Sequence, residues 1–127
     1  MMQTLAAIVF TLLATGVALF QFALVFGAPW GELTLGGRYR GALPLAVRVV
    51  PAATGVLMLG FAAIMLARAG LAFADFDKGA AQLAWFVVAY FGLGVAANAA
   101  TKSVRERRVW LPVAVVMMAA GAVVAIG

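Results

Sequence analysis

The chain has 127 residues, of which 67% are hydrophobic and 10% are charged, and its formal net charge is +5. A soluble domain of this length cannot bury so much apolar surface, so lipid is the expected solvent. The absence of cysteine and histidine excludes disulfides, thiolate metal sites and imidazole catalysis. No cofactor is expected.

No charged side chain precedes Glu32, and this stretch opens the first of several apolar segments. A membrane-spanning helix needs roughly 20 consecutive apolar residues. Four windows meet that requirement, at residues 4–26, 49–67, 80–100 and 109–126. They leave too little chain for a soluble domain, and they lack the alternation of outer-membrane strands. The prediction is an all-α polytopic membrane protein, a single domain over residues 1–127 whose four transmembrane helices form an antiparallel up-down bundle.

The first segment has one small, weakly polar face. At about 100° per residue, the small face is formed by Thr4, Ala7, Thr11, Ala14, Thr15, Ala18 and Gln21, and the remaining, bulky surface includes Leu12, Leu13, Val17, Leu19, Phe20 and Leu24. Apolar burial gives helices in lipid little reason to associate, so close approach through small residues matters more. The small face is therefore expected to look inward.

The connection between the first two segments, residues 27–48, is the most singular part of the chain. Its five glycines permit tight turns, and the rings of Trp30 and Tyr39 suit a membrane interface. We expect a folded loop that covers the helix ends. It serves either as structure alone or as a ligand or partner site.

The other two connections are short and charged. In the second, Asp75 and Asp77 could hold a cation or act as an acid–base pair. Two carboxylates make a poor calcium site, however, so a solvated turn or helix cap is the preferred interpretation. The third connection, residues 102–108, is predicted to be a tight basic turn.

The basic residues indicate an orientation. Three of the nine lie in the first connection, two in the second and four in the third. Because cytoplasmic loops carry the excess of Lys and Arg, the first and third connections are expected in the cytoplasm and both termini outside. The predicted location is the bacterial inner membrane. The net positive charge of the chain is explained by membrane topology and by contact with anionic lipid, and no nucleic-acid partner is expected.

Two sets of residues are candidate sites. Basic and aromatic side chains of the first and third connections are expected to bind anionic phospholipid or a partner protein: Trp30, Arg38, Tyr39, Arg40, Arg48, Lys102, Arg105 and Arg108. Polar side chains in the cytoplasmic half of the bundle form a possible intramembrane layer: Gln21, Thr54, Tyr90, Asn98 and Thr101. Alternatively, Gln21 and Asn98 serve only to form interhelical hydrogen bonds. The Arg48 side chain would then extend along apolar surface so that its guanidinium reaches the membrane interface.

Several local features carry a resemblance. The run from Gly27 to Gly31 (Gly-Ala-Pro-Trp-Gly), the Gly36-Gly37 pair before an arginine, Asn98, and the basic stretch 103–108 ahead of Trp110 and Pro112 resemble a family of small uncharacterised four-span bacterial membrane proteins. The resemblance implies a fold and a location but no activity. Four-span multidrug exporters and sterol isomerases depend on carboxylates inside the bundle, and the predicted spans contain none.

The expected function is non-enzymatic: binding of anionic lipid or of a partner membrane protein through loop 27–48 and turn 102–108, as a single chain, a homo-oligomer or part of a larger membrane complex. The alternative is a small homodimeric transporter or channel whose path is lined by the polar layer. A third interpretation is a lipid-modifying enzyme that uses Arg48 and the loop, but no residue in the sequence indicates a substrate.

Overall fold

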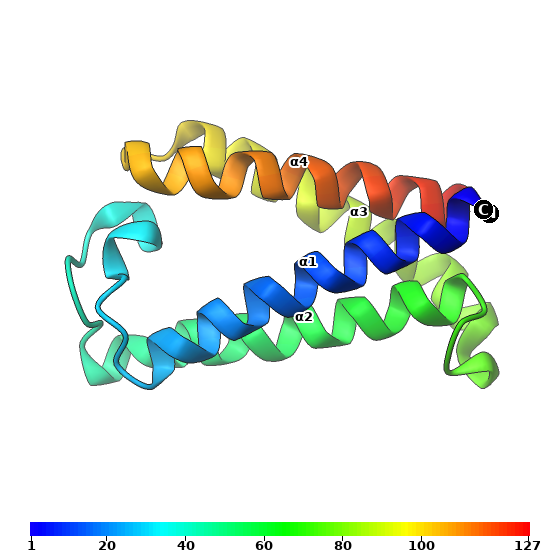
Figure 1. Cartoon of the computed structure of the whole chain (residues 1–127), viewed down its shortest axis with the longest axis horizontal. Coiled ribbons are helices and arrows are strands. Elements are labelled where there is room, and N and C mark those ends of the chain that lie inside the picture. The colour runs from blue at the N-terminus through cyan, green and yellow to red at the C-terminus, as the bar shows by residue number, and fades with distance from the viewer.

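The computed structural model describes residues 1–127, apart from the side chain of Ala74, and consists of long helices joined by short 3-10 turns (Figure 1). The long helices are α1 (Met2–Val25), α2 (Val49–Arg68), α3 (Asp77–Ala100) and α4 (Val104–Ile126). The first connection carries η1 (Gly31–Leu33), η2 (Leu35–Gly37) and η3 (Leu45–Arg48), and the second carries η4 (Ala74–Phe76).

Across the described residues, four helices are long and apolar enough to cross a membrane. They have 23 or 24 residues each when η3 is counted with α2. The prediction of an all-helical chain with four such helices is confirmed.

The start of α4 differs from the prediction. The helix begins at Val104, whereas the sequence predicted a turn over 102–108 and a span from residue 109; the tight-turn prediction is wrong for most of that stretch. Ser103 is the N-cap, and its Oγ accepts a hydrogen bond from the Glu106 N–H at 3.2 Å. A hydropathy window places the start of a span after the last charged residue. The helix itself starts earlier, where its first N–H groups find acceptors.

The helices pack through a shared apolar core. α1 lies against α2 and α4, and α3 lies against α4 and α2. α1 and α3 reach each other through aromatic rings, since Phe10 and Phe91 meet edge to face with centroids 5.5 Å apart. Phe61 of α2 joins them at 5.9 Å from Phe91. Such pairs contribute roughly 0.5–1.5 kcal/mol beyond the apolar area that they bury.

The inward small face predicted for the first helix is confirmed for its alanines, but Thr15 of that face is exposed and Leu24, predicted to face lipid, is buried. Ala7, Ala14 and Ala18 are buried, while Leu12 and Leu19 are 68% and 65% exposed. An exposed leucine side chain on a helix of this hydropathy suits a lipid environment better than water.

The two ends of the molecule differ. At the end with the termini, Gln3 Nε2 donates to Val124 O (3.0 Å) and Arg68 O (3.4 Å), and Arg68 Nη2 donates to Ala125 O (3.3 Å). These bonds tie α1, α2 and α4 together. At the other end, the ribbons of α1 and α4 diverge and the first connection lies between them (Figure 1).

Gly121 of α4 lies beside side chains of all three other long helices and generates a prediction. A Cβ there would contact Met65 and Val88 at 3.5 Å and Phe10 at 3.7 Å, so each of the other helices touches this position. We expect Gly121→Leu to lower the free energy of unfolding by about 1–3 kcal/mol, because the added carbons must displace packed side chains. Unfolding by sodium dodecyl sulfate, followed by circular dichroism, measures the change.

The matched control is Gly16→Leu in α1, where a Cβ meets nothing within 4 Å. This variant should unfold like the wild type. Equal loss in the two variants would contradict the packing at Gly121.

Candidate functional site

The first connection is a folded loop, as predicted. The Gly31 N–H donates to Gly41 O at 2.8 Å, which brings the two arms of the loop together. Arg48 Nε donates to Leu43 O at 2.9 Å, and its Nη1 donates to Val25 O at 3.4 Å. Because helix carbonyls at a C-terminus lack partners and carry partial negative charge, Arg48 both closes the loop and stabilises the end of α1.

The loop is attached to the start of α4 by three hydrogen bonds. Ser103 Oγ donates to Glu32 O (3.0 Å), the Gly36 N–H donates to Glu106 Oε2 (2.8 Å), and Trp110 Nε1 donates to Leu33 O (2.7 Å). Each satisfies a loop backbone group with a side chain of α4 or its cap. At roughly 1 kcal/mol each, they fix the position of η1 and η2 relative to α4.

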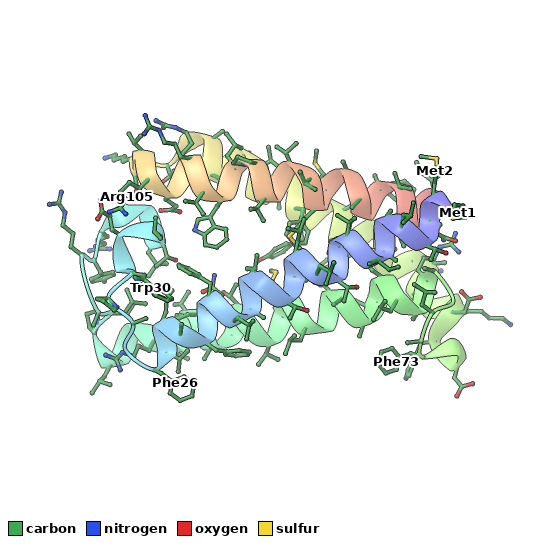
Figure 2. All side chains as sticks on the ribbon, in the orientation of Figure 1. Met1, Met2, Phe26, Trp30, Phe73 and Arg105 are labelled. Carbon is green, nitrogen blue, oxygen red and sulfur yellow. The ribbon has the colours of Figure 1, made fainter. Side chains whose placement is uncertain are left out.

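An ion pair accompanies these bonds. Arg105 Nη1 lies 3.1 Å from Glu32 Oε2, and the two side chains are 67% and 39% exposed. At that exposure a pair contributes little to stability. Figure 2 shows Arg105 at the end of the molecule where the first connection lies. Its guanidinium therefore lies at that surface, paired with Glu32.

Between the loop and the start of α4 lies a polar pocket of about 250 Å³. Its side chains carry three positive charges and one negative charge. The lining residues are Glu32, Gly36, Gly37, Arg40, Lys102, Ser103, Val104 and Arg105. The N–H groups of the first helical turn have no intrahelical acceptor and bear partial positive charge. A helix N-terminus beside Lys and Arg suits an anion such as phosphate.

Gly37 allows the loop to approach α4 this closely. Its φ is +73°, and a Cβ there would lie 2.9 Å from Ser103 Cβ and 3.1 Å from Ser103 Oγ. Only glycine combines the left-handed conformation with room for the neighbouring side chain.

Of the predicted anion-site residues, the structure brings Arg40, Lys102 and Arg105 into the polar pocket. The remaining five, which lie outside its lining, are Trp30, Arg38, Tyr39, Arg48 and Arg108. Trp30 stacks on Phe20 with centroids 6.0 Å apart, and the Arg38 guanidinium lies 5.8 Å from the centre of the Tyr39 ring.

The predicted polar layer is also divided by the structure. Gln21, Tyr90 and Asn98 line a central cavity of about 180 Å³ between the helices, beneath η1. Thr54 and Thr101 do not line it: Thr54 Oγ1 donates to Val50 O within its own helix at 2.9 Å, and Thr101 Oγ1 lies 3.4 Å from Glu106 Oε2. The full lining is Val17, Gln21, Leu33, Thr34, Met58, Tyr90, Phe91, Gly94, Asn98, Glu106, Trp110, Val113, Ala114 and Met117.

The sequence reasoning missed Ser103 and Glu106. Both bind the loop, and each lines one of the two hollows. A signal was present, since Ser-x-x-Glu ahead of an apolar run is the pattern of a capping box. That pattern would have placed the N-cap at Ser103, but it directs the Glu106 carboxylate to the Ser103 N–H, whereas in the structure Glu106 Oε2 accepts from the Gly36 N–H of the loop.

Asp75 and Asp77 are exposed. Among the described residues, no group of three or more His, Cys, Asp or Glu side chains could hold a metal ion.

Comparison with protein-family models, curated proteins and solved structures finds no match. The function is therefore inferred from the geometry.

The contact at Gly37 generates a prediction. Gly37→Ala should separate η2 from Ser103, lower the thermal midpoint and speed amide hydrogen exchange across residues 31–41. The left-handed backbone alone costs an alanine roughly 1–2 kcal/mol, and the contact with Ser103 adds to that. Differential scanning fluorimetry and exchange mass spectrometry measure the two effects.

Gly70→Ala is the matched control, because Gly70 has a φ of +74° but no atom within 4 Å of its Cβ position. It isolates the backbone strain from the contact. If both variants lost the same stability and residues 31–41 exchanged at the wild-type rate in Gly37→Ala, the seating of the loop on α4 would be wrong.

Proposed function

We propose that this chain is a non-enzymatic, multi-pass protein of the bacterial inner membrane that binds the headgroup of an anionic phospholipid in the polar pocket. The four helices cross the bilayer as an antiparallel up-down bundle, with the first connection and the start of α4 on the cytoplasmic side. The observation that carries the proposal is the convergence of Arg40, Lys102 and Arg105 on the first turn of α4.

The charge of the pocket supports an anionic ligand. Arg40 and Lys102 are exposed and face no carboxylate within 4 Å, whereas Glu32 is paired with Arg105. The unpaired N–H groups of Val104 and Arg105 add donors without a side-chain entropy cost. A phosphate diester could thus receive two charged contacts and backbone hydrogen bonds together.

The surroundings of the pocket support a lipid as the source of that anion. Phe26 and Trp30 lie at the same end of the molecule (Figure 2) and are 87% and 46% exposed. Leu35, which precedes the lining residue Gly36, and Val104, which lines the pocket, also expose apolar side chains. Such residues suit the interface between headgroups and hydrocarbon, where cytoplasmic-leaflet phosphates are concentrated.

Removing the two free charges tests the proposal. Each Lys or Arg near an anionic bilayer contributes about 1 kcal/mol, so Arg40→Ala with Lys102→Ala should weaken phosphatidylglycerol binding by about 2 kcal/mol, or roughly 30-fold. Native mass spectrometry of the protein titrated with phosphatidylglycerol, and separately with phosphatidylcholine, measures the affinity.

The charge-matched control is Arg38→Ala with Arg108→Ala. Both residues are exposed and lie at the same end of the chain's fold, but outside the pocket lining. This variant should keep most of the affinity. An equal loss in both variants would assign binding to diffuse surface charge, and no loss in either would refute an anion site.

The proposed orientation has its own test. The chain has no cysteine, so Lys102→Cys and Lys78→Cys each introduce a single thiol at an exposed position. In intact bacterial spheroplasts, a membrane-impermeant maleimide should label Lys78→Cys and leave Lys102→Cys unlabelled until the cells are lysed, because the basic connections stay inside. The reverse labelling would overturn the orientation, and labelling of both would contradict an insertion with one topology.

A further inference from the structure

The central cavity contains polar groups that the fold leaves without partners. Among the described residues, the side chains of Gln21 and Tyr90 form no hydrogen bond, and Asn98 uses only its Nδ2, which donates to Gly94 O at 2.8 Å. All three side chains are partly exposed, and they line the cavity. Their unused polar atoms therefore have open space beside them, where water or a small polar molecule can supply the missing hydrogen bonds.

The size and depth of the cavity limit that occupant. At about 30 Å³ per water, 180 Å³ has room for about six water molecules or one small organic molecule. Tyr90 lies ten residues before the end of α3 at Ala100, which is about 15 Å along the helix axis. The cavity thus reaches from the loop end toward the middle of the bundle, where Tyr90 and Phe61 pack edge to face at 4.8 Å.

The charges around the cavity disfavour an ion. Its one acidic lining residue is Glu106, and the lining contains no basic residue. The Glu106 Oε2 already accepts a hydrogen bond from the Gly36 N–H, and the residue sits in the first turn of α4, where the helix dipole compensates a negative charge. An anion would lose its hydration and meet this carboxylate as a like charge. A cation would lose its hydration for a single carboxylate whose Oε2 already accepts a hydrogen bond and whose charge the helix N-terminus already stabilises.

From these observations we infer that the central cavity is a hydrated site that admits small uncharged hydrogen-bonding molecules, such as amides or polyols, and excludes ions of both signs. The amides of Gln21 and Asn98 and the hydroxyl of Tyr90 offer both donors and acceptors. The apolar walls formed by Val17, Met58 and Phe91 match the uncharged part of such a molecule. This site is separate from the polar pocket and does not depend on lipid binding there.

Three methanethiosulfonate reagents of similar size test the inference: uncharged hydroxyethyl, cationic trimethylammonioethyl and anionic sulfonatoethyl. Gly94→Cys and Ala114→Cys place single thiols in the cavity wall and keep all its polar groups. A Cβ at Gly94 meets nothing within 4 Å, so the substitution fits. Rates are measured by mass spectrometry on the full chain in detergent and divided by the rate of each reagent with free 2-mercaptoethanol.

After this normalisation, the uncharged reagent should modify both cavity thiols at least about tenfold faster than either charged reagent, because charged groups lose more hydration on entry. Two controls bound the measurement. Ala84→Cys, at a fully buried core position outside the cavity, should not react. Gly16→Cys, which also has open space at its Cβ position, reports how far the uncharged reagent reaches a thiol through detergent alone, and it should react more slowly than Gly94→Cys.

The opposing outcomes are distinct. A faster reaction with the cationic reagent would show that Glu106 makes this a cation site, and equal rates with all three reagents would show no selectivity for charge. Reaction of both cavity thiols no faster than Ala84→Cys would show that the cavity is closed and dry. Each of these results overturns the inference. Because the two thiols lie on α3 and α4, misfolding of one variant leaves the other as a reporter.

Discussion

The attachment of the first connection to the start of α4 is the contact on which both hollows depend. Ser103 caps the first turn of α4 and also donates to the backbone of the first connection, and Glu106 accepts a hydrogen bond from the Gly36 N–H, about seventy residues earlier in the chain. On one side of η1 and η2 this contact forms the polar pocket, and on the other it covers the central cavity. Ser103 thus serves both helix capping and loop placement, and the Glu106 carboxylate adds a second attachment of the loop.

Most of the secondary structure follows from the sequence because hydropathy and length report directly on helices that suit lipid. The predicted first and second spans end within one residue of α1 and α2. The small face of α1 also follows, since a helix has a fixed angular period. The start of α4 does not follow from hydropathy, because five charged residues surround a capping motif and hide the helix from an average over apolar content.

The composition of the sites was harder to predict than the positions of the helices. Arg40, Lys102 and Arg105 share a pocket only because η2 folds back against Ser103, and that approach depends on one left-handed glycine, Gly37. Sequence spacing says which residues share a helix face but not which loop meets which helix. For the same reason Arg48, predicted as an anion ligand, bonds instead to carbonyls of its own loop and of α1.

The aromatic contact between α1 and α3 has a mechanical consequence. α1 lies closest to α2, and α3 closest to α4, so the molecule consists of two tightly packed helix pairs. Phe10 of α1 links the two pairs, because its ring meets Phe91 of α3 edge to face at 5.5 Å and lies 3.7 Å from the Cβ position of Gly121 on α4. The contact between the two pairs thus runs through one ring and one bare stretch of helix backbone, and the thickness of that ring limits how near α1 can come to α3 and α4 at this level.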